Sequence, residues 1–156
     1  MDIRIATLAD HPALSTLMFA AIQANQHYTP QQRNAWQSEP KRVDQWPDRL
    51  HNQVVYLAWE SEVPVGFLSL RDDGYLDLAF VAPEQQGRGV FRQLYQHLEN
   101  ENRPRHPYLW THASLAARPA FEAVGFSVVQ EESVATGGQV LRRFEMRKEL
   151  ADVSQA

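Results

Sequence analysis

The chain of 156 residues contains no cysteine. Disulfide bonds, cysteine-ligated zinc, iron–sulfur clusters and a thiol nucleophile are therefore excluded, and we expect a cytoplasmic protein from a reducing compartment. Long apolar runs are missing too, because no stretch approaches the ~20 apolar residues that a membrane-spanning helix requires. The N-terminus carries an acid, Asp2, and lacks the apolar segment that signal peptides contain. These absences predict a protein that is neither exported nor bound in a membrane.

Positive charge is not in excess either. The sequence has 15 Lys and Arg against 19 Asp and Glu, a net charge of −4, whereas broad binding to nucleic acid requires a basic face. We therefore expect no nucleic-acid partner, and we interpret the basic pair Arg142 and Arg143 as solvated. The length suits one globular domain, which we assign to residues 1–150, followed by a flexible C-terminal tail over residues 151–156.

The spacing of apolar residues alternates between strand and helix repeats along the chain. A strand at "IRIA" precedes a helix that begins with a capping-box-like pair, Thr7 and Asp10. A second, short helix begins at Thr29 and Pro30 in a polar region punctuated by proline. A hairpin of "VVYLAWE" and "VPVGFLSLR" is followed by the strand "YLDLAFV". The first half of the chain is thus expected to run β-α-α-β-β-β.

The second half begins with a helix after Gly89, whose apolar residues recur on one side. A strand at "YLWTHA" and a short helix at "RPAFEAVGF" follow, and Gly125 ends that helix. The last two strands, "FSVVQEESV" and "QVLRRFEM", form a hairpin around Gly137 and Gly138. The complete predicted order is β-α-α-β-β-β-α-β-α-β-β.

The stretch "FVAPEQQGRGV" places Gly87 and Gly89 between a strand and the start of a helix. A helix N-terminus presents unpaired N–H groups and the positive end of the helix dipole, and glycine lets the backbone approach a ligand oxygen without a Cβ in the way. This arrangement favours an anion, most often a phosphate. Two common phosphate motifs, G-x-G-x-x-G and G-x-x-x-x-G-K-[ST], are absent. The pattern [Q/R]-x-x-G-x-[G/A] matches from Gln86, with Phe91 at its altered last position.

With these residues the chain resembles the GNAT superfamily of N-acetyltransferases, whose acetyl-CoA pyrophosphate loop carries that pattern after a strand ending in V-x-P. Val81 and Pro83 supply the end of the strand. A second stretch, "SLAARPAFEAVGF", is similar to the family signature N-x-x-A-x-x-x-[YF]-E-x-x-G-F. The two signatures occur in the family's order, and the resemblance extends over nearly the whole chain. The second signature is matched by Ala117, Phe121, Glu122, Gly125 and Phe126.

The resemblance implies an α/β (α+β) fold, with a central mixed, mostly antiparallel sheet of six to seven strands flanked by about four helices. It implies transfer of an acetyl group from acetyl-CoA to a primary amine of a small-molecule or peptide acceptor, by direct attack in a ternary complex and without a metal. A domain of the same fold that binds an acyl-CoA without turnover, as a sensor or partner module, is the alternative. The sequence determines neither the acceptor nor the oligomeric state, so a homodimer remains open.

The resemblance also implies roles for individual residues. A backbone N–H near Val81 polarises the thioester carbonyl, as an oxyanion-type donor. The loop N–H groups bind the pyrophosphate, with help from the side chains of Arg88 and Arg92. The residues expected at the cofactor are Ala79, Phe80, Val81, Gln86, Gly87, Arg88, Gly89, Val90, Phe91, Arg92, Ser114, Ala117 and Phe121.

Three positions depart from the family pattern. Phe91 stands where Gly or Ala is usual, so its ring has to be accommodated beside the cofactor. Ser114 replaces a common Asn and retains a hydroxyl that can bind the cofactor or donate a proton. Phe121 stands where many relatives have a Tyr that protonates the departing thiolate. Since a thiol of pKa ~8.5 leaves tolerably well as its anion, this change does not exclude turnover.

An amine that arrives as an ammonium must lose a proton before it attacks. The candidate proton acceptors are Asp77, His112, His27 and Tyr28. Each has a purely structural alternative: Asp77 suits an outward-facing strand position, His112 suits the edge of a core strand, and the other two can simply begin a turn. In relatives this segment between the first helix and the first hairpin lines the acceptor site. We therefore also expect His27, Tyr28 and Trp36 to contact the acceptor.

Overall fold

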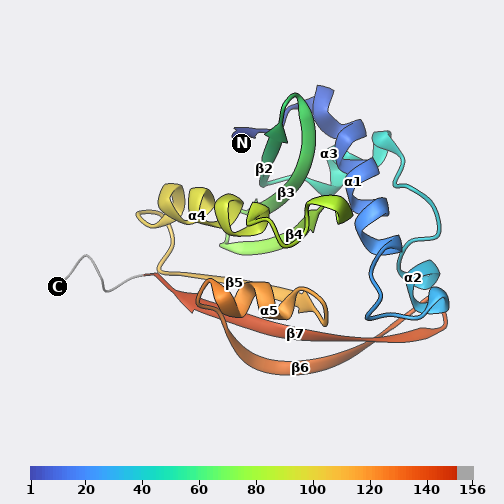
Figure 1. Ribbon diagram of the computed structural model, residues 1–156. Helices are drawn as coiled ribbons and strands as arrows, with labels where there is room; N and C mark the ends of the chain where they lie inside the picture. Colours follow the sequence, from blue (N-terminus) through green and yellow to red (C-terminus); the bar gives the residue numbers. More distant parts are fainter. Residues whose placement is uncertain (151–156) are drawn as a thin grey trace.

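The computed structural model describes residues 1–150, which form one seven-stranded sheet with helices on both faces (Figure 1). The strand order is β1-β2-β3-β4-β5-β7-β6, and every neighbouring pair is antiparallel except β4 and β5. The predicted mixed, mostly antiparallel sheet is confirmed. The predicted tail, residues 151–156, lies outside the described residues. The strands are β1 (Asp2–Ile5), β2 (Gln53–Glu60), β3 (Val63–Arg71), β4 (Tyr75–Val81), β5 (Tyr108–Ser114), β6 (Ser127–Thr136) and β7 (Gln139–Glu149).

The described part of the chain has five α-helices, one more than predicted. They are α1 (His11–Gln23), α2 (Pro30–Trp36), α3 (Trp46–Arg49), α4 (Val90–Asn102) and α5 (Arg118–Ala123), with single 3-10 turns at Leu8–Asp10, Val43–Gln45 and Pro83–Gln85. The prediction of α2 is confirmed, and Thr29 caps it by accepting the Gln32 N–H through its hydroxyl at 3.1 Å. None of these helices has the length and apolar character needed to cross a bilayer.

The additional helix, α3, is held in place by a long-range contact. Trp46 is fully buried, and its indole N–H donates to the Ser15 hydroxyl of α1 at 2.7 Å. The sequence analysis treated Pro47 only as a break in the chain, although proline is well suited to the first turn of a helix. A four-residue helix has too few residues for a periodic signal, so packing of the Trp46 side chain decides this structure.

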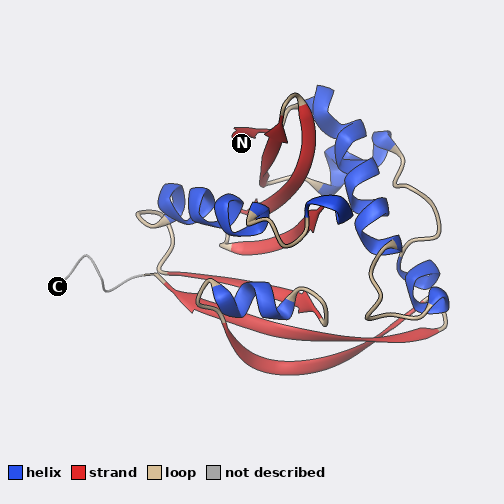
Figure 2. Cartoon of the chain, viewed as in Figure 1, coloured by secondary structure: helices blue, strands red, loops and turns tan. Residues whose placement is uncertain are grey.

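Two hydrophobic clusters lie on opposite faces of the sheet, because successive strand residues point to opposite sides. In β2, Tyr56 and Ala58 join the cluster under α4 and α5, whereas Val55 and Leu57 join the cluster under α1 and α3. Figure 2, in the view of Figure 1, shows α1, α3 and α4 beside the upper part of the sheet, α5 over β5 and β7, and the long β6–β7 hairpin at the bottom. The far end of that hairpin lies beside α2, where the Gln32 side chain donates to the Val140 carbonyl at 3.1 Å.

The sheet opens between its two parallel strands. β4 and β5 pair only at Tyr75 with Trp110 and at Leu76 with Thr111, and beyond these residues they diverge. Figure 1 shows the resulting gap between the β4 side and the β5 side of the molecule. A register shift between β3 and β4, opposite Ser69 and Leu70, leaves Asp77 without a paired residue at this point. Such bulges increase local twist, which helps β4 to turn away from β5.

Candidate active site

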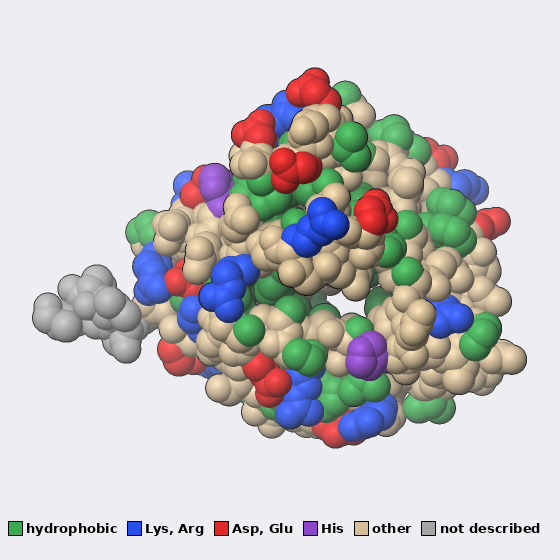
Figure 3. Space-filling view, in the orientation of Figure 1, with side chains coloured by type: hydrophobic (Ala, Val, Ile, Leu, Met, Phe, Trp, Pro, Cys, Tyr) green, Lys and Arg blue, Asp and Glu red, His purple; other side chains and the backbone are tan. Residues whose placement is uncertain are grey.

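Two cavities meet at the opening between β4 and β5. The first has a volume of about 620 Å³ and lies over the glycine loop. The second has a volume of about 470 Å³ and is lined from α1, α2, β4, β5 and the β6–β7 hairpin. The space-filling view shows an opening through the molecule in this region (Figure 3). The residues that line both cavities, and so mark their junction, are Trp36, Ala79, Phe80, Ser114 and Ala117.

The glycine loop presents backbone N–H groups to the first cavity. Gly87 and Gly89 have φ of +80° and +83°, values that side chains with a Cβ rarely adopt. A Cβ built on Gly87 would meet no protein atom within 4 Å, so the space beside the loop is open to a ligand. Helix α4 begins directly after Gly89, and the N–H groups of its first turn have no partner within the helix. The loop fits the predicted anion site.

The ring of Phe91 lies against neighbouring aromatic side chains. It meets Phe121 edge to face, with ring centroids 5.0 Å apart, and lies nearly parallel to Tyr95 at 6.4 Å. Phe121 itself is buried in the core between Phe91 and Phe126. The Phe91 ring is therefore accommodated by packing against Phe121 and Tyr95. In this position it forms part of the wall of the first cavity, between α4 and α5.

The backbone of Val81 points its N–H into the opening. Ala82 donates to the Val65 carbonyl of β3 at 2.9 Å, and in an antiparallel pair the residues that bond to the partner strand alternate with residues whose N–H groups point the other way. The N–H groups of Val81 and Ala79 therefore face away from β3, toward the side where β5 has diverged. This orientation is the one that the expected oxyanion donor requires.

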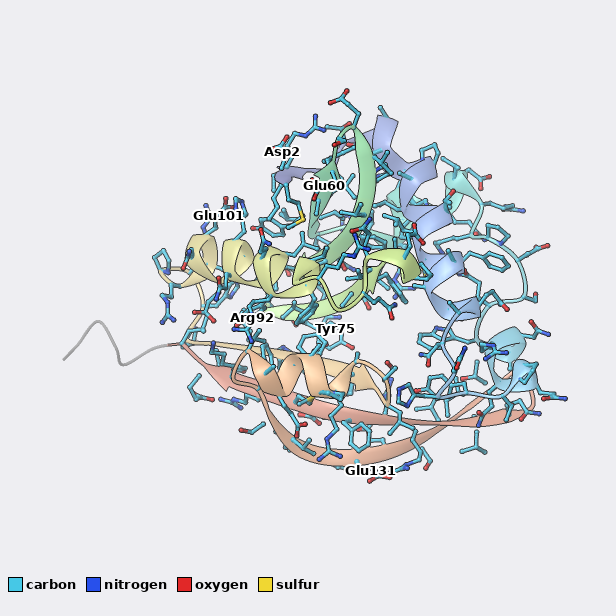
Figure 4. The ribbon with its side chains drawn as sticks, viewed as in Figure 1. Asp2, Glu60, Tyr75, Arg92, Glu101 and Glu131 are labelled. Atoms are coloured by element: carbon cyan, nitrogen blue, oxygen red, sulfur yellow. The ribbon has the colours of Figure 1, made fainter. Side chains whose placement is uncertain are left out.

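Ser114 ends β5 at the junction of the two cavities. Its hydroxyl oxygen accepts the N–H of Ala117 at 3.1 Å, which leaves the hydroxyl proton available to another acceptor. The side chain of Arg92 lines the first cavity and extends from α4 toward α5 (Figure 4). Arg88 is exposed and does not line either cavity. Arg92 is thus better placed than Arg88 for the predicted contact with the cofactor.

The carboxylate of Asp77 is held by two neighbouring side chains. Arg49 donates to both of its oxygens, at 2.9 and 3.0 Å, and the Gln53 amide donates at 2.9 Å. Burial alone raises the pKa of Asp77, but these hydrogen bonds outweigh it and the pKa is lowered. A carboxylate in this state is a weak base, and its side chain is not outward-facing as one reading of the sequence predicted. The geometry therefore argues against Asp77 as the general base.

His112 is better suited to accept a proton in the second cavity. Its Nδ1 lies 2.8 Å from the Tyr75 hydroxyl, and its Nε2 lies 3.9 Å from a carboxylate oxygen of Glu132. Burial, together with the nearby Arg143 guanidinium, lowers the pKa of His112, so the imidazole is neutral at neutral pH. Tyr75 lies between the two parts of the sheet (Figure 4). This environment gives a neutral imidazole in the second cavity.

His112 also belongs to a group of potential metal ligands. Ligand atoms of His112, Glu132 and Glu145 lie within 4.8 Å of one another. One of them is already engaged, because Arg143 donates its Nε to Glu132 at 2.7 Å. A metal ion would have to compete with this guanidinium for the carboxylate.

The three residues expected at the acceptor are divided between the cavities. Tyr28 and Trp36 line the second cavity, and their rings meet edge to face at 5.8 Å. His27 lines the first cavity and not the second. The Tyr28 hydroxyl is buried and accepts the backbone N–H of Leu115 at 2.8 Å.

Several residues of the second cavity were not expected from the sequence. Lys41, Arg49 and Tyr75 line it, together with Arg142 and Arg143 of β7. Lys41 and Arg49 come from the segment between α2 and β2, where the sequence has no motif. The interpretation of Arg142 and Arg143 as merely solvated is incomplete, since both form ion pairs, with Glu131 and Glu132 respectively.

Comparisons with known proteins agree with this architecture. Residues 24–150 match the acetyltransferase (GNAT) domain family. The chain is 34% identical over 151 residues to the uncharacterized N-acetyltransferase YafP of Escherichia coli (strain K12), with 94% of this chain and 95% of that protein covered. The crystal structure of a GCN5-related N-acetyltransferase from Rhodopseudomonas palustris is similar, with a TM-score of 0.87, 28% identity and coverage of 95% of this chain and 94% of that chain.

A second solved structure is yncA from Salmonella typhimurium, determined with its cofactor acetyl-CoA. It has the same fold, with a TM-score of 0.75, 20% identity and coverage of 97% of this chain and 95% of that chain. The family match covers most of the sequence, and both predicted signatures lie within it. This protein belongs to the GNAT family of N-acetyltransferases.

Proposed function

We propose that this GNAT enzyme transfers the acetyl group of acetyl-CoA to the primary amine of a small acceptor by direct attack in a ternary complex. The observation that carries the proposal is the meeting of two cavities at the opening between β4 and β5. The first cavity supplies an anion site at the glycine loop, and the second reaches the junction from the other side. Cosubstrate and acceptor can therefore bind at the same time, with their reacting groups near Ala79 and Ser114.

In the proposed reaction the amine nitrogen forms a bond to the thioester carbonyl carbon. The Val81 N–H, which faces the opening, stabilises the negative charge that develops on the carbonyl oxygen. The carbon–sulfur bond then breaks and CoA leaves as a thiolate, while the nitrogen of the new amide gives up its second proton to solvent. The thiolate takes a proton from solvent, or from the Ser114 hydroxyl, which solvent then reprotonates. A dedicated phenolic acid is not required, since a thiol of pKa ~8.5 is an adequate leaving group.

The incoming ammonium must first lose a proton, and we assign this proton to His112. The imidazole is neutral, lines the acceptor cavity and lies two residues before Ser114 on the same face of β5. Its hydrogen bond with Tyr75 orients the ring. The pyrophosphate is held by the N–H groups from Gly87 to Arg92 and by the Arg92 side chain. The proposal includes a cytoplasmic enzyme, which the absence of cysteine supports.

The experiment is a screen of acetyl-CoA turnover against a panel of amines, read by release of free CoA thiol. We expect release that depends on the acceptor and requires no added metal. Binding of CoA without release by any amine would favour the non-catalytic alternative. A thermal shift with CoA alone would not separate these two functions, since both require CoA binding.

A further inference from the structure

The second cavity contains one cation, Lys41, that forms no ion pair with a carboxylate of the described chain. Lys41 lines the cavity and is half-buried, and its ammonium lies 5.4 Å from the centre of the Trp46 ring. No ion pair connects Lys41 to an acidic side chain within residues 1–150. Burial and the nearby Arg49 lower the pKa of Lys41, and the carboxylate of Asp77 opposes this shift only in part.

The other cations of this cavity are already paired. Arg142 donates to Glu131 at 2.8 Å and Arg143 donates to Glu132 at 2.7 Å. Arg49 binds Asp77, which is the single carboxylate among the described residues that line the cavity. Since Gln53 also donates to Asp77, this carboxylate has little capacity for a further cation. The Lys41 side of the cavity therefore attracts an anion and repels a second ammonium.

The β5 side of the cavity contains the proposed proton acceptor. His112 lies beside Glu132 and Glu145, and Glu145 is its paired residue on β7. Glu145 has no ion pair with any Lys or Arg of the described chain. Neither glutamate lines the cavity, and Glu132 is paired with Arg143, which does. The acceptor amine is placed at His112 because the proposed proton transfer takes place there.

We infer that the acceptor is a primary amine that also carries an anionic group, such as the carboxylate of an amino acid, and that Lys41 binds this group. The inference rests on the proposed function and specifies its substrate class. The amine is oriented toward His112 and Ser114, and the anionic group toward Lys41 on the opposite wall. Polyamines and other polycationic acceptors are disfavoured, since their second ammonium would lie beside Lys41.

The test compares amino acids with their own carboxamides as acceptors, and with 1,5-diaminopentane as a polyamine probe. The carboxamide keeps the amine and the side chain but removes the negative charge. We expect kcat/KM for the best amino acid to exceed that of its carboxamide by about tenfold or more, since charge-assisted hydrogen bonds are among the stronger ones. Equal values for acid and carboxamide, or a preference for the diamine, would overturn the inference.

Three variants test whether Lys41 is responsible. Lys41→Gln should bring the ratio of acid to carboxamide toward one, mainly through the KM of the acid, and Lys41→Arg should retain the preference. Arg42→Gln is the matched control, because it removes a neighbouring, exposed cation that does not line the cavity. A preference that survives in Lys41→Gln would show that another group binds the carboxylate and would contradict the assignment.

A binding measurement separates this inference from the proposed function. Calorimetric titration of the acid and its carboxamide into protein saturated with CoA needs no turnover. Tighter binding of the acid, lost in Lys41→Gln, would support the acceptor class even if no CoA were released, in which case the proposed catalysis alone would fail. Acceptor-dependent CoA release without discrimination between acid and carboxamide would leave catalysis in place and overturn the inference.

Discussion

Tyr28 accepts a hydrogen bond from the backbone N–H of Leu115 at 2.8 Å, although the two residues are 87 positions apart in the sequence. This bond ties the segment before α2 to the end of β5, where the two cavities meet. Leu115 directly follows Ser114, so Tyr28 fixes the backbone on which the Ser114 hydroxyl is placed.

Replacing Tyr28 by Phe should destabilise the fold and disturb the acceptor site. Loss of this part-buried hydrogen bond should cost about 0.5–1.5 kcal/mol, and the KM for the acceptor should rise because the Ser114 region is less well ordered. Urea unfolding and steady-state kinetics measure the two effects. Tyr108→Phe is the control, since no hydrogen bond to the Tyr108 hydroxyl is found in residues 1–150. Equal stability of the two variants would contradict this role for Tyr28.

The glycine loop offers a test in which strain and ligand binding are separated. Gly87 and Gly138 have φ of +80° and +79°, and neither would place a Cβ within 4 Å of another protein atom. Alanine at either site should therefore cost a similar amount of stability, about 1–2 kcal/mol. Only Gly87→Ala should weaken CoA binding in calorimetry, because its Cβ occupies the open side of the loop. Unchanged CoA affinity in that variant would remove the loop from the binding site.

The pH dependence of kcat and of kcat/KM should rise to a plateau. His112 must be neutral to accept the proton, and burial lowers its pKa in the free enzyme, so the rising limb of kcat/KM should lie below the ordinary value of ~6.5. His112→Gln should abolish this limb and lower the plateau. No fall is expected on the alkaline side of kcat, since no phenolic acid is required. An alkaline limb that disappears in Ser114→Ala would instead place Ser114 in a proton relay.

The same pKa has a consequence for stability. Because the folded pKa of His112 lies below that of the unfolded chain, the unfolded state binds the proton first as the pH falls. The contribution of neutral His112 to the free energy of unfolding is therefore complete above pH ~6.5. It is lost as the pH falls below that value. His112→Gln should flatten the stability profile in this range in urea unfolding. A profile that keeps its slope would mean that another group causes it.

Installing the missing phenol should have little effect on catalysis. Phe121→Tyr should leave kcat at neutral pH nearly unchanged, since the thiolate already leaves without a dedicated acid. The variant should also be less stable than the parent, because the Phe121 ring is buried and an unpaired hydroxyl there is costly. A large increase in kcat would show that leaving-group protonation limits the reaction.

The sequence predicts the regular elements well because their signals are local. The β-branched and aromatic residues of β2 and β3 and the Thr29–Pro30 start of α2 are signals carried by neighbouring residues, and the structure confirms these elements. The signal for the glycine loop is local as well, since Gly87 and Gly89 carry both the sequence pattern and the positive φ angles. Long-range contacts were not predictable in this way. The helix α3 depends on the contact of Trp46 with Ser15 of α1, which no spacing in the sequence indicates.

The candidate acceptor site illustrates the same limit. Arg49 and Asp77 are 28 residues apart, and only the fold brings them into an ion pair that weakens Asp77 as a base. Lys41 lies in a proline-rich segment without a motif, so its place in the cavity could not be anticipated. His27 and Tyr28 are adjacent in sequence but line different cavities. Residue types and their order in the sequence indicate the region of the candidate site. Only the fold determines which of the two cavities each residue lines.

The divergence of β4 and β5 creates two additional strand edges within the sheet. Sheets normally leave unpaired peptide groups only on their outermost strands, here β1 and β6, and exposed edges of that kind promote aggregation by pairing with strands of other molecules. The edges of β4 and β5 lie instead in the walls of the two cavities. Their free backbone groups are thereby available to a small molecule while the surrounding helices and the β6–β7 hairpin separate them from other protein chains.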